Sequence, residues 1–239
     1  MLVVLDVDSS GEPVEVPAPE SPLLLLISLA HAGELNFSPD RPGIGDSTTS
    51  VGGGAVMIEG GVQAIVDPTA VGTSGVVGRI GLSKTLEARV RAPDFVLLDD
   101  GVLVGPVGLG TKVGGHLDEH WSLSFVPEVY VQPGGGSVGA NLGTNLAYGL
   151  DNVGLWLHAA TTVSEAGTTG FFGGGASCGF DALGVYVNGG RGFNGDPVVG
   201  GGGWIPLSAT AQLDFGCDLT LDGGTARPAF LLGTSLGFD

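Results

Sequence analysis

Several segments of this sequence alternate residue by residue between apolar and polar side chains. Charged residues of both signs recur at the polar positions of these segments. If these segments close into a barrel, the polar positions line the interior. The charges would then form either a constriction that selects solutes or ions, or an internal ion-pair network that compensates buried charge and holds the barrel round. The predicted lumen-lining residues are Glu59, Gln63, Arg79, Glu87, Arg89, Arg91, Lys112, Glu128, Asp214 and Asp218. Four of them, Glu59, Arg79, Glu87 and Arg89, fall on three successive segments and can therefore pair.

Two short motifs suggest cofactor or metal chemistry but lack the structural context that such chemistry needs. The run of His116, Asp118, Glu119 and His120 contains metal-type ligands, yet it falls in a hairpin turn rather than on a helix. Gly190–Gly195 has the spacing GxGxxG, but no helix follows it to bind a phosphate. We therefore expect a solvated turn and a flexible turn, with no cofactor and no metal.

The composition favours a β-rich protein. The chain has 239 residues, of which 46 are Gly, 43% are hydrophobic and 14% are charged. This is too apolar for a disordered acidic chain and too rich in Gly for a helical bundle. With 8 basic and 25 acidic residues the formal net charge is −17, which would repel nucleic acid.

The N-terminus has features of an export signal. The apolar run Pro22–Ala30 is followed by small residues at Ala30 and Ala32, which predicts cleavage between Ala32 and Gly33. The leader is atypical because Met1–Ser21 contains five acidic residues and no Lys or Arg. The alternative is a buried apolar segment of the folded domain. The predicted organisation is a signal peptide at 1–32, an irregular periplasmic lead-in at 33–54 and a barrel at 55–239.

Twelve β segments separated by turn residues are predicted after Gly53. They are Ala55–Asp67, Val76–Ser83, Leu86–Leu98, Val102–Leu117, Trp121–Gln132, Val138–Leu150, Val153–Ser164, Phe171–Phe180, Leu183–Gly192, Val198–Leu207, Ala211–Asp222 and Ala229–Phe238. The fifth shows the alternation well, since Trp121, Leu123 and Phe125 alternate with Ser122 and Ser124.

Alternation alone does not separate a soluble sandwich from a membrane barrel. The even number of segments, their length and the aromatic residues near their ends favour an all-β, antiparallel, up-and-down transmembrane barrel of twelve strands. Cys178 and Cys217 lie on segments three apart in order, so we expect two separate thiols rather than a disulfide.

Several stretches resemble the outer-membrane barrel family connected with the meta-pathway of phenol degradation. Phe37–Val51 (FSPDRPGIGDSTTSV) resembles the family's opening, and Ile58–Val62 (IEGGV) its first strand. Arg79–Arg91 (RIGLSKTLEARVR) resembles its hairpin R-x-G-L-T-x-x-L-E-L-R, and Leu231–Phe238 its closing strand, although Asp239 here follows the final aromatic residue. The resemblance implies a porin-like outer-membrane barrel for uptake of aromatic or other hydrophobic compounds.

The predicted function is passive uptake of small solutes across the bacterial outer membrane. Glycines on the lumen phase, including Gly114, Gly233 and Gly237, remove side-chain volume and predict an open or partly open lumen. The expected partners are outer-membrane lipids, the barrel assembly machinery and a small-molecule solute. One alternative is a structural or adhesion barrel with a blocked lumen. Another is an outer-membrane lipid hydrolase, but His116, His120 and His158 show no fixed spacing to a serine, so no enzyme is predicted.

Overall fold

The computed structural model describes residues 6–7, 13–14, 35–41, 43–66, 69–98, 101–134, 138–193 and 195–239, and within them the chain is all-β. The strands are β1 (Asp6–Val7), β2 (Pro13–Val14), β3 (Val56–Ile65), β4 (Ala70–Gly81), β5 (Leu86–Arg91), β6 (Phe95–Leu98), β7 (Gly101–Val104), β8 (Val107–His116), β9 (Trp121–Val131), β10 (Val138–Leu150), β11 (Val153–Ser164), β12 (Gly167–Gly179), β13 (Gly184–Gly192), β14 (Pro197–Ser208), β15 (Ala211–Asp222) and β16 (Thr225–Phe238). The predicted signal peptide at 1–32 and its cleavage point lie outside the described residues, apart from the short pair β1 and β2.

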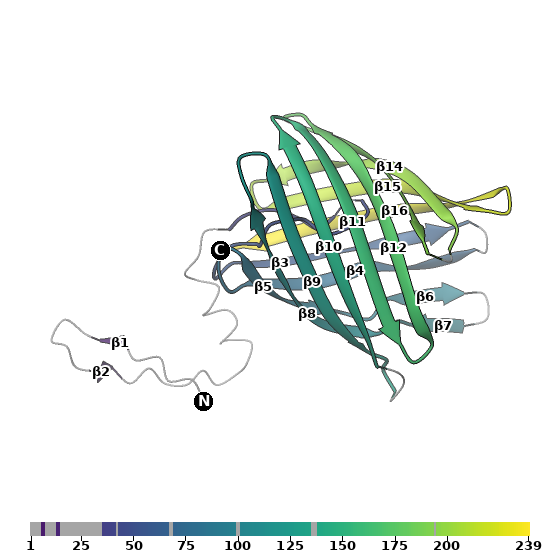
Figure 1. Cartoon of the computed structure of the whole chain (residues 1–239), viewed down its shortest axis with the longest axis horizontal. Coiled ribbons are helices and arrows are strands. Elements are labelled where there is room, and N and C mark those ends of the chain that lie inside the picture. The colour runs from purple at the N-terminus through teal and green to yellow at the C-terminus, as the bar shows by residue number, and fades with distance from the viewer. Residues whose placement is uncertain are drawn as a thin grey trace.

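The strands close into a single antiparallel barrel (Figure 1). Pairing runs from β3 through β4, β5 and β8 and then along consecutive strands to β16, which pairs back with β3. The barrel thus has twelve strands, as predicted, and β6 and β7 form an additional hairpin that pairs with β4. Among the residues that the structure describes, no helix has the length and apolar character needed to cross a membrane.

Two of the twelve predicted segments are interrupted. The segment Leu86–Leu98 divides into β5 and β6, and the segment Val102–Leu117 corresponds to β7 and β8. The breaks contain Pro93 and Pro106. Proline has no backbone N–H to donate to a ladder, so each of these residues ends the regular pairing.

Three strands, β4, β12 and β16, begin at least four residues earlier along the chain than predicted, most clearly β4, which starts at Ala70 rather than Val76. The stretch Ala70–Gly75 lacks alternation in its sequence, so no local pattern indicates a strand there. Its register against β3 shifts between Glu59 and Gly61. Gly75, with φ of +60°, supplies the left-handed backbone conformation that this bulge contains.

Side chains alternate between an apolar outer face and a polar inner face. On β9, for example, the outward Phe125 is 45% exposed, whereas its inward neighbour Ser124 is fully buried. The exposed large hydrophobic residues recur around the barrel and include Ile58, Leu109, Leu142, Leu157 and Leu232. This inversion of the usual soluble pattern is that of a transmembrane barrel, in which lipid solvates the apolar face.

A small apolar core lies where the chain leaves the barrel interior and enters β3. Val51, Ala55 and Met57 are fully buried there. The chain passes so close to β4 that a Cβ atom on Gly81 would lie 1.5 Å from the carbonyl oxygen of Gly52. The amide of Gly81 also donates to the Ala55 carbonyl oxygen at 2.9 Å. Only a glycine fits at this crossing.

Replacing Gly81 with Ala should therefore destabilise the folded barrel. The added methyl group meets backbone rather than a flexible side chain, so we expect a loss of at least about 1 kcal/mol in the free energy of unfolding. Urea titration of the refolded protein, followed by tryptophan fluorescence, measures this loss. Gly149→Ala is the matched control, because a Cβ atom there meets nothing within 4 Å. Equal midpoints for the two variants would contradict the prediction.

Candidate functional site

The residues that precede the barrel in sequence cross its lumen. We call residues 35–41 and 43–54 the inner segment. Arg41 binds Asp214 on β15, with Nη2 3.1 Å from Oδ1. On β11, Trp156 Nε1 donates to the carbonyl oxygen of Ile44 at 2.8 Å, and on β9, Ser122 contacts Thr48 through their hydroxyl groups at 2.6 Å. The inner segment is irregular, but it lies inside the barrel, whereas we expected a lead-in ahead of it.

Arg79 on β4 is a fully buried cation of the lumen wall, with no exposed surface. Its Nη1 lies 2.6 Å from Glu59 Oε1 on β3, and its Nε lies 2.8 Å from Glu87 Oε1 on β5. Both carboxylates are also buried. The three side chains come from adjacent strands and all lie on the inner phase, so the alternation of the sheet brings them together.

Asp40 of the inner segment joins this cluster from the opposite side. Its Oδ1 lies 2.6 Å from Lys112 Nζ, and its Oδ2 lies 2.7 Å from Arg89 Nη1. Burial alone would raise the pKa of the Asp40 carboxyl group. The neighbouring Arg79, Lys112 and Arg89 instead hold this pKa well below its ordinary value. Asp40 is therefore an ionised counter-charge for three cations of the wall.

A second carboxylate of the inner segment extends the network. Asp46 Oδ1 accepts from Arg89 Nη2 at 2.8 Å. Ser47 bridges the two sides, because its hydroxyl donates to Asp40 and accepts from Lys112 at 2.8 and 2.9 Å. The inner segment is thus held by charged and hydroxyl side chains. In the part of the chain that the structure describes, residues 37–50 form no backbone ladder with the wall.

The structure assembles eight of the ten predicted lumen residues into three sets and leaves two outside them. The sets are Glu59, Arg79, Glu87, Arg89 and Lys112 around Asp40; Arg91 with Glu128, which also lies 3.4 Å from Arg89 of the first set; and Asp214 with Arg41, while Gln63 and Asp218 lie on the inner phase outside these sets. Arg91 Nη2 is 3.4 Å from Glu128 Oε2, and Tyr130 donates to the same oxygen.

Sequence reasoning missed the inner-segment members of the network, Asp40, Arg41 and Asp46. The signal that could have indicated them is the glycine on the inner faces of the strands. A Cβ atom on Gly233 would lie 2.5 Å from the Arg41 guanidinium, and one on Gly114 would lie 2.5 Å from the Thr48 carbonyl oxygen. At Gly114, Gly233 and Gly237 the inner segment therefore occupies the volume that the glycines leave, so these glycines do not by themselves open the lumen.

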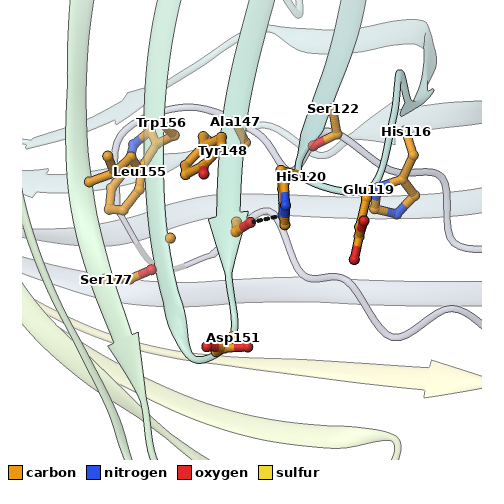
Figure 2. Close-up of a pocket in the computed structure, with 12 residues that line it drawn as sticks. His116, Glu119, His120, Ser122, Ala147, Tyr148, Asp151, Leu155, Trp156 and Ser177 are labelled. Atoms are coloured by element: carbon orange, nitrogen blue, oxygen red, sulfur yellow. Dashed lines mark hydrogen bonds between the residues drawn. The ribbon is translucent and has the colours of Figure 1, made fainter.

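A cavity of about 500 Å³ lies beside the turns β8–β9 and β10–β11, and His116, Glu119 and His120 contribute to its lining (Figure 2). The β8–β9 turn is fixed by Asp118, whose carboxylate accepts hydrogen bonds from the backbone N–H groups of Trp121 and His120 at 2.7 and 2.8 Å. These hydrogen bonds lower the pKa of Asp118. Among the described residues, no group of three His, Cys, Asp or Glu side chains could hold a metal ion.

Two of the three histidines considered for a hydrolase, His120 and His158, have other partners. His120 Nδ1 lies 3.1 Å from the carbonyl oxygen of Gly149, as the dashed line in Figure 2 shows. His158 Nδ1 lies 2.7 Å from Asn145 Oδ1 in the lumen. These contacts do not build a nucleophile and base pair. Cys178 and Cys217 are free, as expected.

Solved structures resemble this barrel, although no protein-family model and no curated protein matches the sequence. The KdgM porin aligns with a TM-score of 0.61 at 5% identity, covering 77% of this chain and 99% of that one. The NanC porin gives 0.56 at 9% identity, with 76% and 98% covered. An outer-membrane channel from Pseudomonas putida F1 gives 0.56 at 11% identity, with 77% and 95% covered. The chain therefore has the fold of outer-membrane porins, and the connection with phenol degradation stays a prediction.

Replacing Arg79 with Met should strongly destabilise the barrel. The change leaves Glu59, Glu87 and Asp40 as buried carboxylates with less compensating charge, which costs about 3–5 kcal/mol for a buried pair. Urea unfolding measures the effect. Arg227→Met is the control, since the Arg227 and Asp222 side chains at the rim are 42% and 39% exposed and their pair contributes at most about 1 kcal/mol. Similar losses in the two variants would rule out the central role of Arg79.

The stability of the barrel should depend on pH through Asp40. Its pKa is lower in the folded than in the unfolded state, so its stabilising contribution is complete above about pH 4 and is lost as the pH falls through the folded value. We expect wild type to lose more stability between pH 5 and pH 3 than Asp40→Asn does. Urea midpoints measured along this range test the difference, and parallel curves would contradict it.

Proposed function

We propose that the protein is a porin-like channel of the bacterial outer membrane for passive uptake of small solutes, including aromatic or hydrophobic compounds. The observation that carries the proposal is the closed barrel with an apolar outer face and a polar, charged inner wall. An outer face of this kind needs lipid as its solvent, and a barrel presents no open edge to the bilayer. Insertion would require the barrel assembly machinery of the outer membrane.

The inner segment would control passage through this channel. It crosses the lumen from β15 to β9 and β11, so a solute must pass beside it or displace part of it. Its contacts with the wall are made largely by side chains such as Asp40 and Asp46. Such contacts can be exchanged without opening the ladders of the barrel, which favours a channel whose width depends on the position of this segment.

Aromatic side chains on the inner phase support small aromatic solutes as candidates. Phe171 on β12 lies against His158, with ring centroids 6.0 Å apart. Tyr130, Trp156 and Tyr186 also belong to the inner phase of their strands. Aromatic rings bind other rings by stacking and offer a polar group at one edge. One solved KdgM structure is a complex with disordered oligogalacturonate.

A structural or adhesion barrel with a blocked lumen is the second candidate, and the inner segment is the observation that favours it. Residues of the inner segment contact strands on opposite sides of the lumen. If these contacts are permanent, the barrel would insert into membranes without conducting. Conductance therefore separates the two functions.

We expect the refolded full chain to give discrete current steps in a planar lipid bilayer, with a defined reversal potential under a salt gradient. Asp40→Ala should increase the step size, because it removes the counter-charge that Lys112 and Arg89 share. Asp181→Ala changes the same charge at an exposed turn and is the control. Steps of equal size in both variants would argue against control by the inner segment. Insertion without any steps would support the blocked barrel.

A further inference from the structure

A second polar group lies on the lumen wall, on strands that do not contribute to the cluster around Arg79. Asn188 on β13, Gly200 on β14 and Asp218 on β15 are direct neighbours in register across the sheet. The row lies on the inner phase, because Asp218 is four residues along β15 from the buried Asp214. The side chains of Asn188 and Asp218 therefore flank a glycine.

Three side-chain atoms of this row have no hydrogen-bond partner among the described residues. Asn188 is only 9% exposed, and both its Oδ1 and Nδ2 atoms are buried without a hydrogen bond in the described residues. Asp218 Oδ1 is likewise buried and unpartnered. Leaving such groups unsatisfied is unfavourable, and folded proteins pair nearly all of them with protein, water or ligand. The row is therefore suited to accept a hydrogen-bond donor from outside the chain.

Glycines flank the row on the neighbouring strands. A Cβ atom on Gly200 would lie 1.9 Å from Asp218 Oδ1 and 2.8 Å from Asn188 Oδ1, so the two oxygens converge over this residue. Gly175 on β12 is the register neighbour of Asn188 on its other side. In the next inner row, Gly202 and Gly216 lie beneath the Tyr186 hydroxyl group. Among the residues that the structure describes, no side chain donates to either of the two oxygens.

Asp218 also differs from the other acidic residues predicted for the lumen in its ion pairing. Glu59, Glu87, Glu128 and Asp214 each have an Arg or Lys nitrogen within ion-pair distance. Among the described residues Asp218 has none. The residue as a whole is half-buried, so part of its surface faces the lumen although Oδ1 itself is buried. An unpaired carboxylate beside a convergent amide oxygen attracts a cation that donates hydrogen bonds.

We propose that Asp218 and Asn188 bind the ammonium group of a small organic amine in the lumen. A primary ammonium group has several N–H donors and can satisfy both convergent oxygens while it neutralises the carboxylate. A calcium ion needs six to eight oxygen ligands, more than this row supplies. A hydroxyl group has one proton to donate and leaves the charge of Asp218 uncompensated. The proposal rests on the proposed function in one respect, since the amine reaches the site through the lumen.

Calorimetric titration of the refolded full chain in detergent micelles tests the site with three probes of the same shape. Benzylammonium should bind, whereas benzyl alcohol and benzoate should bind at least about tenfold more weakly, because only the amine brings a compensating charge. Its affinity should fall as NaCl is added. Equal binding of benzyl alcohol and benzylammonium, or the absence of benzylammonium binding, would overturn the proposal.

Variants then localise the binding. Asp218→Asn keeps the shape of the side chain and should weaken benzylammonium binding about tenfold or more. Gly200→Ala leaves both polar residues in the sequence but places a methyl group where their oxygens converge, so it should weaken binding as well. Asp222→Asn changes the same charge on β15 at the rim, where Asp222 pairs with Arg227, and should leave binding unchanged. Far-UV circular dichroism verifies that each variant is folded.

Binding that survives Asp218→Asn in a folded protein would overturn the proposed site. Binding in micelles does not depend on ion flow across a bilayer, so the two proposals can fail separately. Benzylammonium binding without conductance would contradict the channel and support the site. Conductance without benzylammonium binding would support the channel and contradict the site.

Discussion

The compensation of buried charge in the lumen is the constraint on which the rest of the structure depends. Arg79 has no exposed surface, and a guanidinium group in that position stays charged. Glu59 and Glu87 on the adjacent strands and Asp40 on the inner segment surround it. Removing any one of these groups would leave an uncompensated charge in a region of low dielectric constant. The wall of the barrel and the inner segment are therefore parts of a single electrostatic unit.

This unit explains why an irregular stretch of chain lies inside a barrel without joining its ladders. Lys112 and Arg89 project from β8 and β5, and their nearest wall carboxylates also serve other cations. Asp40 and Asp46 supply the additional negative charge. The same arrangement makes the inner segment exchangeable in principle, since a charge-assisted hydrogen bond can be transferred to water or solute, whereas a strand of the closed sheet cannot leave alone.

The sequence predicts the strands of the barrel wall far better than the course of the inner segment inside it. Alternation has a period of two residues, so Phe125 and Ser124 can be assigned to opposite faces from their immediate neighbours alone. The breaks at Pro93 and Pro106 are also local signals, which the count of segments passed over. The partners of Asp40, in contrast, lie 49 and 72 residues away along the chain. No periodicity links an irregular segment to such distant positions, so its course inside the lumen could not be derived.

Glycines on the inner wall show why composition alone cannot tell a filled lumen from an open one. At Gly233 the absent side chain makes room for Arg41 of the inner segment, and the charge there is paired with Asp214. At Gly200 the absent side chain makes room for two oxygens that have no donor among the described residues. Both positions are glycine, but the charged groups beside Gly233 pair with each other, whereas the oxygens beside Gly200 have no donor among the described residues. A solute in the lumen would therefore find unmet hydrogen-bonding capacity on β13 to β15, outside the cluster around Arg79 in which the chain has already neutralised its own charges.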